Sequence, residues 1–265
     1  MTASLNRISA LVLRYAFLMR NSWPRLLELV YWPAMQMVLW GFITQFLVTQ
    51  SSWIAQTAGL LIAAVLLWDV LFRGQLGVSL TFFEEMYARN LGHLFVSPLR
   101  AYELVMAMLF VSLVRTLIGV GGAALLAIPL YEYSIFAMGW PLLAFFANLL
   151  IFAWSIGLIV SALVLRYGLG AENLAWALIF AIAPVSGVYY PLSVLPDWLQ
   201  PIAAALPSSH VFEGMRAVLI DHVFRWDLFA QSLLLNAVYL AGAIAVFLAT
   251  FRAARSHGWL LHIGE

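Results

Sequence analysis

Long apolar runs separated by short polar segments make up most of this chain. A helix of about 20 apolar residues is long enough to cross the hydrocarbon core of a bilayer. Six runs are close to that length or longer, and they cover residues 26–48, 54–80, 104–130, 138–165, 173–190 and 228–251. The runs are continuous, whereas the strands of a membrane barrel alternate apolar and polar residues. The pattern predicts an all-α polytopic membrane protein with six transmembrane helices in one domain, residues 1–265.

The second apolar run is longer than a single crossing requires. From Ile54 to Phe83 it would measure about 45 Å as a helix, at about 1.5 Å per residue. The hydrocarbon core is only about 30 Å thick. We therefore expect this helix to tilt, to bend at Gly74 or Gly77, or to emerge from the membrane.

The segment before the first span has helical spacing of a different kind. Residues 5–20 place Leu11 and Tyr15 on one face and Arg7 and Arg14 on another. This pattern predicts an amphipathic helix in the membrane interface. The alternative is a frayed leader.

A polar segment, FFEEMYARNLGHLFVSPLR (Phe82 to Arg100), separates the second and third spans. Two glutamates, then Arg89 and Gly92, predict a helix over 84–97, because acidic residues favour the positive end of the helix dipole and glycine can end a helix. Ser97, followed by proline, predicts the N-cap of the third span. The segment has more apolar residues than a solvated loop helix needs, which favours a docking element over that alternative. The candidate contact residues are Glu84, Glu85, Arg89, Leu91 and Phe95.

Proline is concentrated between the fifth and sixth spans, where Pro184 to Asp227 holds five of the ten prolines. Each proline removes a helical hydrogen bond, so one straight helix is not expected here. We predict two short helices within 196–222, one starting near Pro196 and one capped by Ser208 or Ser209. Because these helices are apolar, we expect them to re-enter the membrane edge.

The distribution of arginine predicts the orientation. With six spans both termini lie on one side, and that side carries nine arginines: Arg7, Arg14, Arg20, Arg25, Arg89, Arg100, Arg166, Arg252 and Arg255. The opposite side carries Arg216 and Arg225. The positive-inside rule therefore places both termini and the 84–97 segment in the cytoplasm.

Composition limits the chemistry. Hydrophobic residues make up 65% of the chain and charged residues 9%, and cysteine and lysine are absent. Because a P-loop needs the lysine of GxxxxGK[ST], we expect no ATPase site in this chain. The histidines show no HExxH spacing, so no metal site is predicted. Ser208-Ser209-His210 suggests a protease, but no GxSxG is present and adjacent residues need not face each other. We expect no catalytic residue and no cofactor in the chain itself.

Three charged residues fall deep inside predicted spans, namely Asp69, Arg73 and Arg115, whereas Glu28 lies near the entry of the first span, where water can reach it. Asp69 and Arg73 are spaced for an ion pair within one helix, and Arg115 could instead reach Asp69 from the third span. A charge inside a bilayer generally faces a partner or a water-filled cavity. A structural pair is therefore favoured over a substrate contact.

A few polar and aromatic residues could line a pathway, namely Gln36, Gln45, Tyr189 and Tyr190. Aromatic residues at the outer boundary are also expected as an interfacial belt. We favour the belt.

Four features in this order resemble the type 2 ABC-exporter permease family. They are the amphipathic N-terminus, LVYWPAMQMVLWGFI in the first span, EEMYARNLGHLFVSPLR after the second, and SGVYYPLSVLPDWLQPIAAALPSSHVFEGMRAVLI before the sixth. The resemblance covers nearly the whole chain. It departs from the family's frequent Glu, Gly-Thr, Glu pattern at Ala88 to Gly92.

The resemblance implies a half-transporter of the bacterial inner membrane. Two copies would form the pathway among membrane lipids, and a separate ATPase subunit would bind ATP and Mg²⁺. The segment 84–97 would be the coupling helix, the N-terminal helix would also meet the ATPase, and re-entrant helices would cap the pathway. The cargo would be an amphipathic, lipid-linked or drug-like molecule moved outward, with no nucleic-acid partner. Two other classes stay open: an intramembrane enzyme acting through His210 or a serine, and a non-transporting assembly subunit.

Overall fold

The computed structural model describes residues 2–50 and 52–257, and within them every regular element is a helix. The long helices are α1 (Thr2–Arg20), α2 (Trp23–Gln50), α3 (Ser52–Tyr87), α5 (Ala101–Tyr131), α6 (Trp140–Tyr167) and α10 (Trp226–His257). The shorter ones are α4 (Leu91–Val96), η1 (Ile135–Met138), η2 (Leu169–Ala171), α7 (Asn173–Val185), η3 (Leu192–Val194), α8 (Gln200–Ala204), α9 (Pro207–Arg216) and η4 (Ala217–Asp221).

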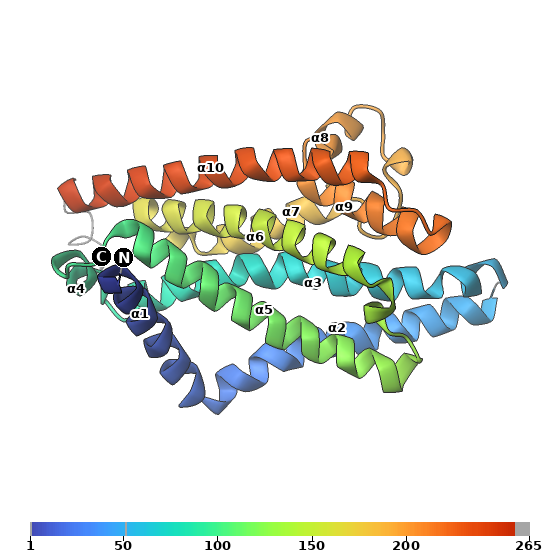
Figure 1. The fold of residues 1–265 in the computed structure, drawn as a ribbon, viewed down its shortest axis with the longest axis horizontal. Helices are drawn as coiled ribbons and strands as arrows, with labels where there is room; N and C mark the ends of the chain where they lie inside the picture. The colour runs from blue at the N-terminus through green and yellow to red at the C-terminus, as the bar shows by residue number, and fades with distance from the viewer. Residues whose placement is uncertain (1, 51, 258–265) are drawn as a thin grey trace.

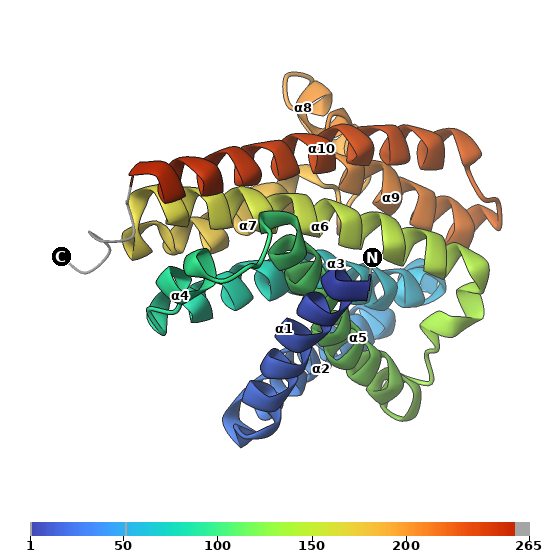
Figure 2. The same cartoon turned by 60° about the vertical axis from the view of Figure 1, so that its left-hand side comes forward.

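Helix α3 occupies the centre of the bundle. It packs against α2, α5 and α6, and α10 covers α6 from the other side. Glycines allow α3 to approach its neighbouring helices closely. A Cβ on Gly157 of α6 would lie 2.7 Å from the Val78 side chain of α3. A Cβ on Gly77 would lie 2.9 Å from Ser112 of α5. Helix α1 instead packs on α5 at an angle to the long helices (Figure 2).

Within the described residues, five helices are long and apolar enough to cross a membrane, and they lie in α2, α3, α5, α6 and α10. They correspond to five of the six predicted spans. The predicted fifth span, 173–190, is not such a helix, because α7 has 13 residues and is about 20 Å long. The six-span prediction is therefore not confirmed. Figure 1 shows α7 starting where α6 ends and stopping partway along the bundle.

The start of α1 and the end of α10 lie at the same end of the bundle as α4 (Figure 1). We call this the α4 end. Helix α3 reaches it without a break, because its 36 residues form one helix of about 54 Å. The helix is therefore not interrupted at Gly74 or Gly77, whereas its tilt and its emergence from the membrane stay predictions.

The predicted helix 84–97 is wrong as a single element. Glu84 and Glu85 belong to the last turn of α3, so they lie at a C-terminal helix end and the dipole argument does not apply to them. The chain turns at Arg89, with φ of 50°, and a separate α4 follows. Gly92 lies inside α4 and does not end it.

Two predicted helix caps are also wrong. Ser97 is the C-cap of α4, and α5 starts later, with Arg100 as its N-cap. The N-cap of α9 is Leu206. Both candidate serines are buried inside the first turn of α9, where Ser209 donates to the Ala203 carbonyl at 2.6 Å. Two short helices lie within 196–222, namely α8, which starts at Gln200, and α9, and their re-entry into the membrane edge stays a prediction.

Candidate functional site

At the α4 end, charged side chains bind α1 to the bundle. The Glu103 carboxylate, buried in the first turn of α5, accepts hydrogen bonds from Arg7 Nε at 2.8 Å and Nη2 at 2.6 Å. Ser4 Oγ donates to it at 2.6 Å, and the backbone N–H of Arg100 donates at 2.9 Å. The hydrogen bond to Glu103 raises the pKa of Arg7. Because the Glu103 carboxylate is ion-paired and accepts several hydrogen bonds, it fixes the start of α1 on α5.

A second carboxylate holds the middle of α1. Glu85 is buried in the last turn of α3 and lies 3.0 Å from Arg14 Nη1. Asn90, in the following turn, donates to the same carboxylate at 2.6 Å. Tyr15, next to Arg14, is fully buried, and burial together with the Glu85 charge raises the pKa of its hydroxyl.

The adjacent Glu84 joins three helices. Its Oε1 lies 3.2 Å from Arg115 Nη2 on α5 and 3.9 Å from Arg25 Nη1 on α2. Together with the two sites above, these contacts link α1, α2, α3 and α5 at one end of the bundle. We refer to Arg7, Arg14, Arg25, Glu84, Glu85, Glu103 and Arg115 as the carboxylate cluster.

The pairing of the membrane-embedded charges differs from both predicted alternatives. Arg115 reaches Glu84 and not Asp69. Asp69 is 1% exposed, and neither of its carboxylate oxygens has a hydrogen-bond partner among the described residues. Within the same residues, Asp69 and Arg73 form no ion pair, although they are one turn apart on α3. The helical spacing permits that pair, but the side chains do not meet.

The predicted contact residues of the 84–97 segment differ in their solvent exposure. Arg89 is exposed, whereas Leu91 is buried against the core. The side chain of Phe95 lies outside the described residues. Val96 is 90% exposed and is the most exposed large apolar residue identified in the described chain. The sequence alone did not single it out, because its exposure follows from how α4 folds back.

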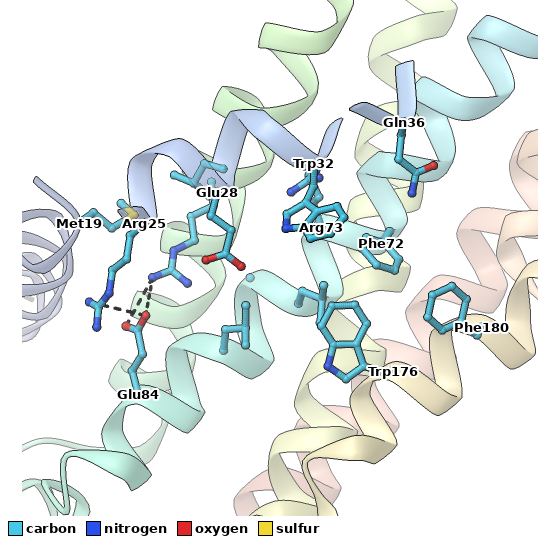
Figure 3. A pocket seen from close by; sticks show the side chains of 15 residues that line it. Met19, Arg25, Glu28, Trp32, Gln36, Phe72, Arg73, Glu84, Trp176 and Phe180 are labelled. Atoms are coloured by element: carbon cyan, nitrogen blue, oxygen red, sulfur yellow. Dashed lines mark hydrogen bonds and ion pairs between the residues drawn. The ribbon is translucent and has the colours of Figure 1, made fainter. Parts of the chain in front are cut away.

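A cavity of about 320 Å³ lies beside the carboxylate cluster (Figure 3). It is lined by Met19, Arg25, Glu28, Leu29, Trp32, Gln36, Phe72, Arg73, Leu76, Gly77, Leu80, Glu84, Arg115, Trp176 and Phe180. These residues come from the end of α1 and from α2, α3, α5 and α7. Arg25, Glu28 and Glu84 lie at one end of the cavity and Trp176 and Phe180 at the other, while Arg73 lies between them beside Trp32 (Figure 3).

Of the four predicted pathway residues, Gln36 lines this cavity. Gln45 is exposed farther along α2. The Tyr189 ring stacks on Trp40, with centroids 4.5 Å apart, and the Tyr190 hydroxyl donates to the Pro184 carbonyl at 2.5 Å. The cavity residues that sequence reasoning missed, Trp176 among them, come from helices distant in sequence, and no local motif marks them.

The proline-rich segment is fastened at the opposite end of the bundle from α4 (Figure 1). Arg216, nearly buried on α9, donates to the carbonyls of Gly187 and Tyr190, the latter at 2.7 Å. Glu213 accepts a hydrogen bond from the Leu192 N–H at 2.7 Å. Burial lowers the pKa of Arg216, and the nearby Glu213 charge opposes that shift.

The serine–histidine sequence in α9 does not assemble a catalytic pair. Ser208 Oγ bonds Ser186 Oγ at 2.7 Å, while His210 Nε2 lies 2.8 Å from the Ala204 carbonyl. No group of three or more metal-ligating side chains occurs in the part of the chain that the structure describes. The hydroxyl and imidazole groups here serve local packing.

Comparison with known proteins gives one family. The model of the family described as ABC-2 type transporter matches residues 11–220, from the middle of α1 through α9 into η4. No curated protein matches the chain. The matched range contains the whole cavity and most of the carboxylate cluster.

Proposed function

Since this chain belongs to the ABC-2 type transporter family, we propose that it is the permease subunit of an ATP-driven exporter that moves an amphipathic, lipid-linked or drug-like molecule outward. Family membership and the five candidate spans make it a multi-pass membrane component of an ABC transporter. The family match over residues 11–220 is the observation that carries the proposal.

Energy would come from a separate subunit. The chain has no lysine, and a P-loop uses lysine to reach the nucleotide phosphates. We therefore place ATP and Mg²⁺ on a partner ATPase. Its docking surface would be the α4 end, where Arg89 and Val96 are exposed.

The carboxylate cluster supports a mechanical role for that surface. Force applied to α4 would pass into α3 through a short turn, and from Glu84 to α5 and α2 through Arg115 and Arg25. The Glu85–Arg14 pair would carry α1 along. Linked elements of this kind can move as one rigid body when an ATPase closes beneath them.

We place the α4 end in the cytoplasm of a bacterial inner membrane. The arginine-rich segments lie there, and positive residues are retained on the cytoplasmic side. A homodimer would complete the pathway. In the single chain α2 and α10 are mostly exposed despite being apolar, which leaves faces for lipid or for a second copy.

The test combines assembly with transport. A tagged full-length chain should co-purify an ATP-binding subunit, and membrane vesicles containing the complex should move amphipathic probes only with ATP. Val96→Asp should release the subunit because it places a charge in the docking surface. Val194→Asp is the matched control, since Val194 is 66% exposed in η3, away from α4. Failure of the wild-type chain to retain any ATP-binding subunit would reject the proposal.

A further inference from the structure

We propose that the cavity beside the carboxylate cluster is a binding site for an amphiphile with an anionic, phosphate-like headgroup. The inference rests on the proposed function in one respect, because the bound amphiphile would be the cargo. The binding itself can be measured without transport.

The cavity has two chemically different ends (Figure 3). Toward α1, Arg25 and Glu84 approach each other with Glu28 nearby. Toward α7, Trp176 and Phe180 form an aromatic wall. A ligand that satisfies both ends needs a polar head and an apolar body. The volume of about 320 Å³ falls at the lower end of the range of about 300–1,000 Å³ that is usual for ligand pockets.

The charge of the whole lining favours an anion. Three arginines and two glutamates line the cavity, so the lining carries one excess positive charge. Glu84 already accepts from Arg115 and lies near Arg25. Arg73 forms no ion pair with a described residue, and its buried Nε has no hydrogen-bond partner there.

Arg73 therefore supplies the unmatched donor. Guanidinium groups bind phosphate and carboxylate oxygens through paired hydrogen bonds. An anionic head in the cavity would supply the counter-charge that Arg73 lacks at ion-pair distance among the described residues. Glu28, also in the lining, would oppose an anion and would attract a cationic head instead. Because three arginines and two glutamates line the cavity, the lining as a whole favours the anionic head.

The aromatic end favours an apolar tail. The Phe72 ring packs on Trp176 and Phe180, with centroids 5.8 and 6.0 Å away. Phe180 is 61% exposed and Trp32 56% exposed, so this end opens to the surroundings of the helices. Within a bilayer those surroundings are acyl chains. A tail could therefore reach the rings from the lipid while the head lies near Arg73.

The test compares three amphiphiles with the same tail: dodecyl phosphate, dodecyltrimethylammonium and dodecyl maltoside. Each competes with radiolabelled dodecyl phosphate for the purified full-length protein in lipid nanodiscs. We expect dodecyl phosphate to compete at a concentration at least about tenfold lower than the other two, as one charged hydrogen-bonded contact would give. Equal competition by all three would overturn the proposal, and preference for dodecyltrimethylammonium would assign the site to cations.

Variants test where the amphiphile binds and which headgroup charge the site prefers. Arg73→Gln should weaken dodecyl phosphate binding about tenfold, and Arg73→Lys should retain part of it, since lysine keeps the charge but not the fork of donors. Glu28→Gln should strengthen the binding. Arg252→Gln, which removes an exposed arginine on α10 outside the cavity, should leave it unchanged. Unchanged binding in both Arg73 variants would overturn the assignment to this cavity.

Two further results separate the explanations. Inorganic phosphate at millimolar concentration should displace little label, and displacement matching that by dodecyl phosphate would mean a site for free phosphate and not for an amphiphile. Trp176→Ala should weaken all three amphiphiles alike. Binding as expected in a protein that exports nothing would reject the transport proposal and retain this site. Active export with no headgroup preference in binding would retain the transport proposal and reject this site.

Discussion

Arg14 on α1 lies 3.0 Å from the carboxylate of Glu85, which is buried in the last turn of α3. Seventy-one positions separate the two residues in sequence. Their contact fixes an amphipathic N-terminal helix to the end of the central helix. The strength of this attachment can be measured.

Arg14→Gln should destabilise the protein by about 1–3 kcal/mol. Among the described residues, it leaves the buried carboxylate with Asn90 as the remaining side-chain hydrogen-bond donor, and removing one partner of a fully buried pair costs about 3–5 kcal/mol. The smaller figure allows for the partial exposure of Arg14. Denaturant titration in detergent measures the free energy of unfolding. Arg20→Gln removes an exposed arginine from the same helix and should change little; an equal loss in both variants would contradict the prediction.

Glu84→Gln should reduce transport per ATP hydrolysed several-fold while the complex stays assembled. The substitution removes the charge that links α3 to Arg115 and Arg25, but it does not alter the exposed face of α4. The ratio of probe transported to phosphate released measures the coupling. Glu132→Gln, at the far end of α5, is the control. Normal coupling in Glu84→Gln would remove the cluster from the mechanism.

Asp69→Asn should stabilise the fold or leave it unchanged. Both Asp69 oxygens are buried without a donor among the described residues, and an unpaired buried charge is costly. A neutral amide of the same shape avoids that cost, and we expect a gain of up to about 2 kcal/mol. Thermal unfolding in nanodiscs gives the sign. A clear loss of stability would mean that Asp69 has a partner in the assembled protein.

Arg216→Gln should loosen the proline-rich segment and cost about 2–3 kcal/mol. The nearly buried guanidinium donates to two loop carbonyls, which would lose charged hydrogen bonds worth about 1.5–3 kcal/mol. Limited proteolysis should then cut between α7 and α8 at a lower protease concentration. Arg225→Gln, an exposed arginine paired with its neighbour Asp227, should leave the cutting pattern unchanged. Protection equal to the wild type in Arg216→Gln would show that other contacts hold the segment.

Local pattern was informative wherever a helix is long and uniformly apolar. The runs that begin near Leu26, Leu104 and Leu228 all fold as helices with bounds close to those predicted. The pattern failed at 173–190, because apolar composition alone does not show that the helix stops at Val185 and the chain then turns at Gly187. The pattern failed again at Glu84, where two adjacent glutamates resemble the start of a helix but lie in the last turn of α3.

The sequence alone showed that this is a helical membrane protein without lysine. The length of an apolar run and the absence of a residue type can both be recognised without knowing which residues are in contact. The sequence also marked Glu84, Glu85, Asp69, Arg73 and Arg115 as charges that require an explanation. Which of them meet was decided only by the tertiary structure. An ion pair or a cavity depends on distances between helices far apart in the chain, and packing around α3 sets those distances. That packing places Glu84 in contact with Arg115. It leaves both carboxylate oxygens of Asp69 without a hydrogen-bond partner among the described residues. It also forms the cavity in which Arg73 has no counter-charge at ion-pair distance among those residues.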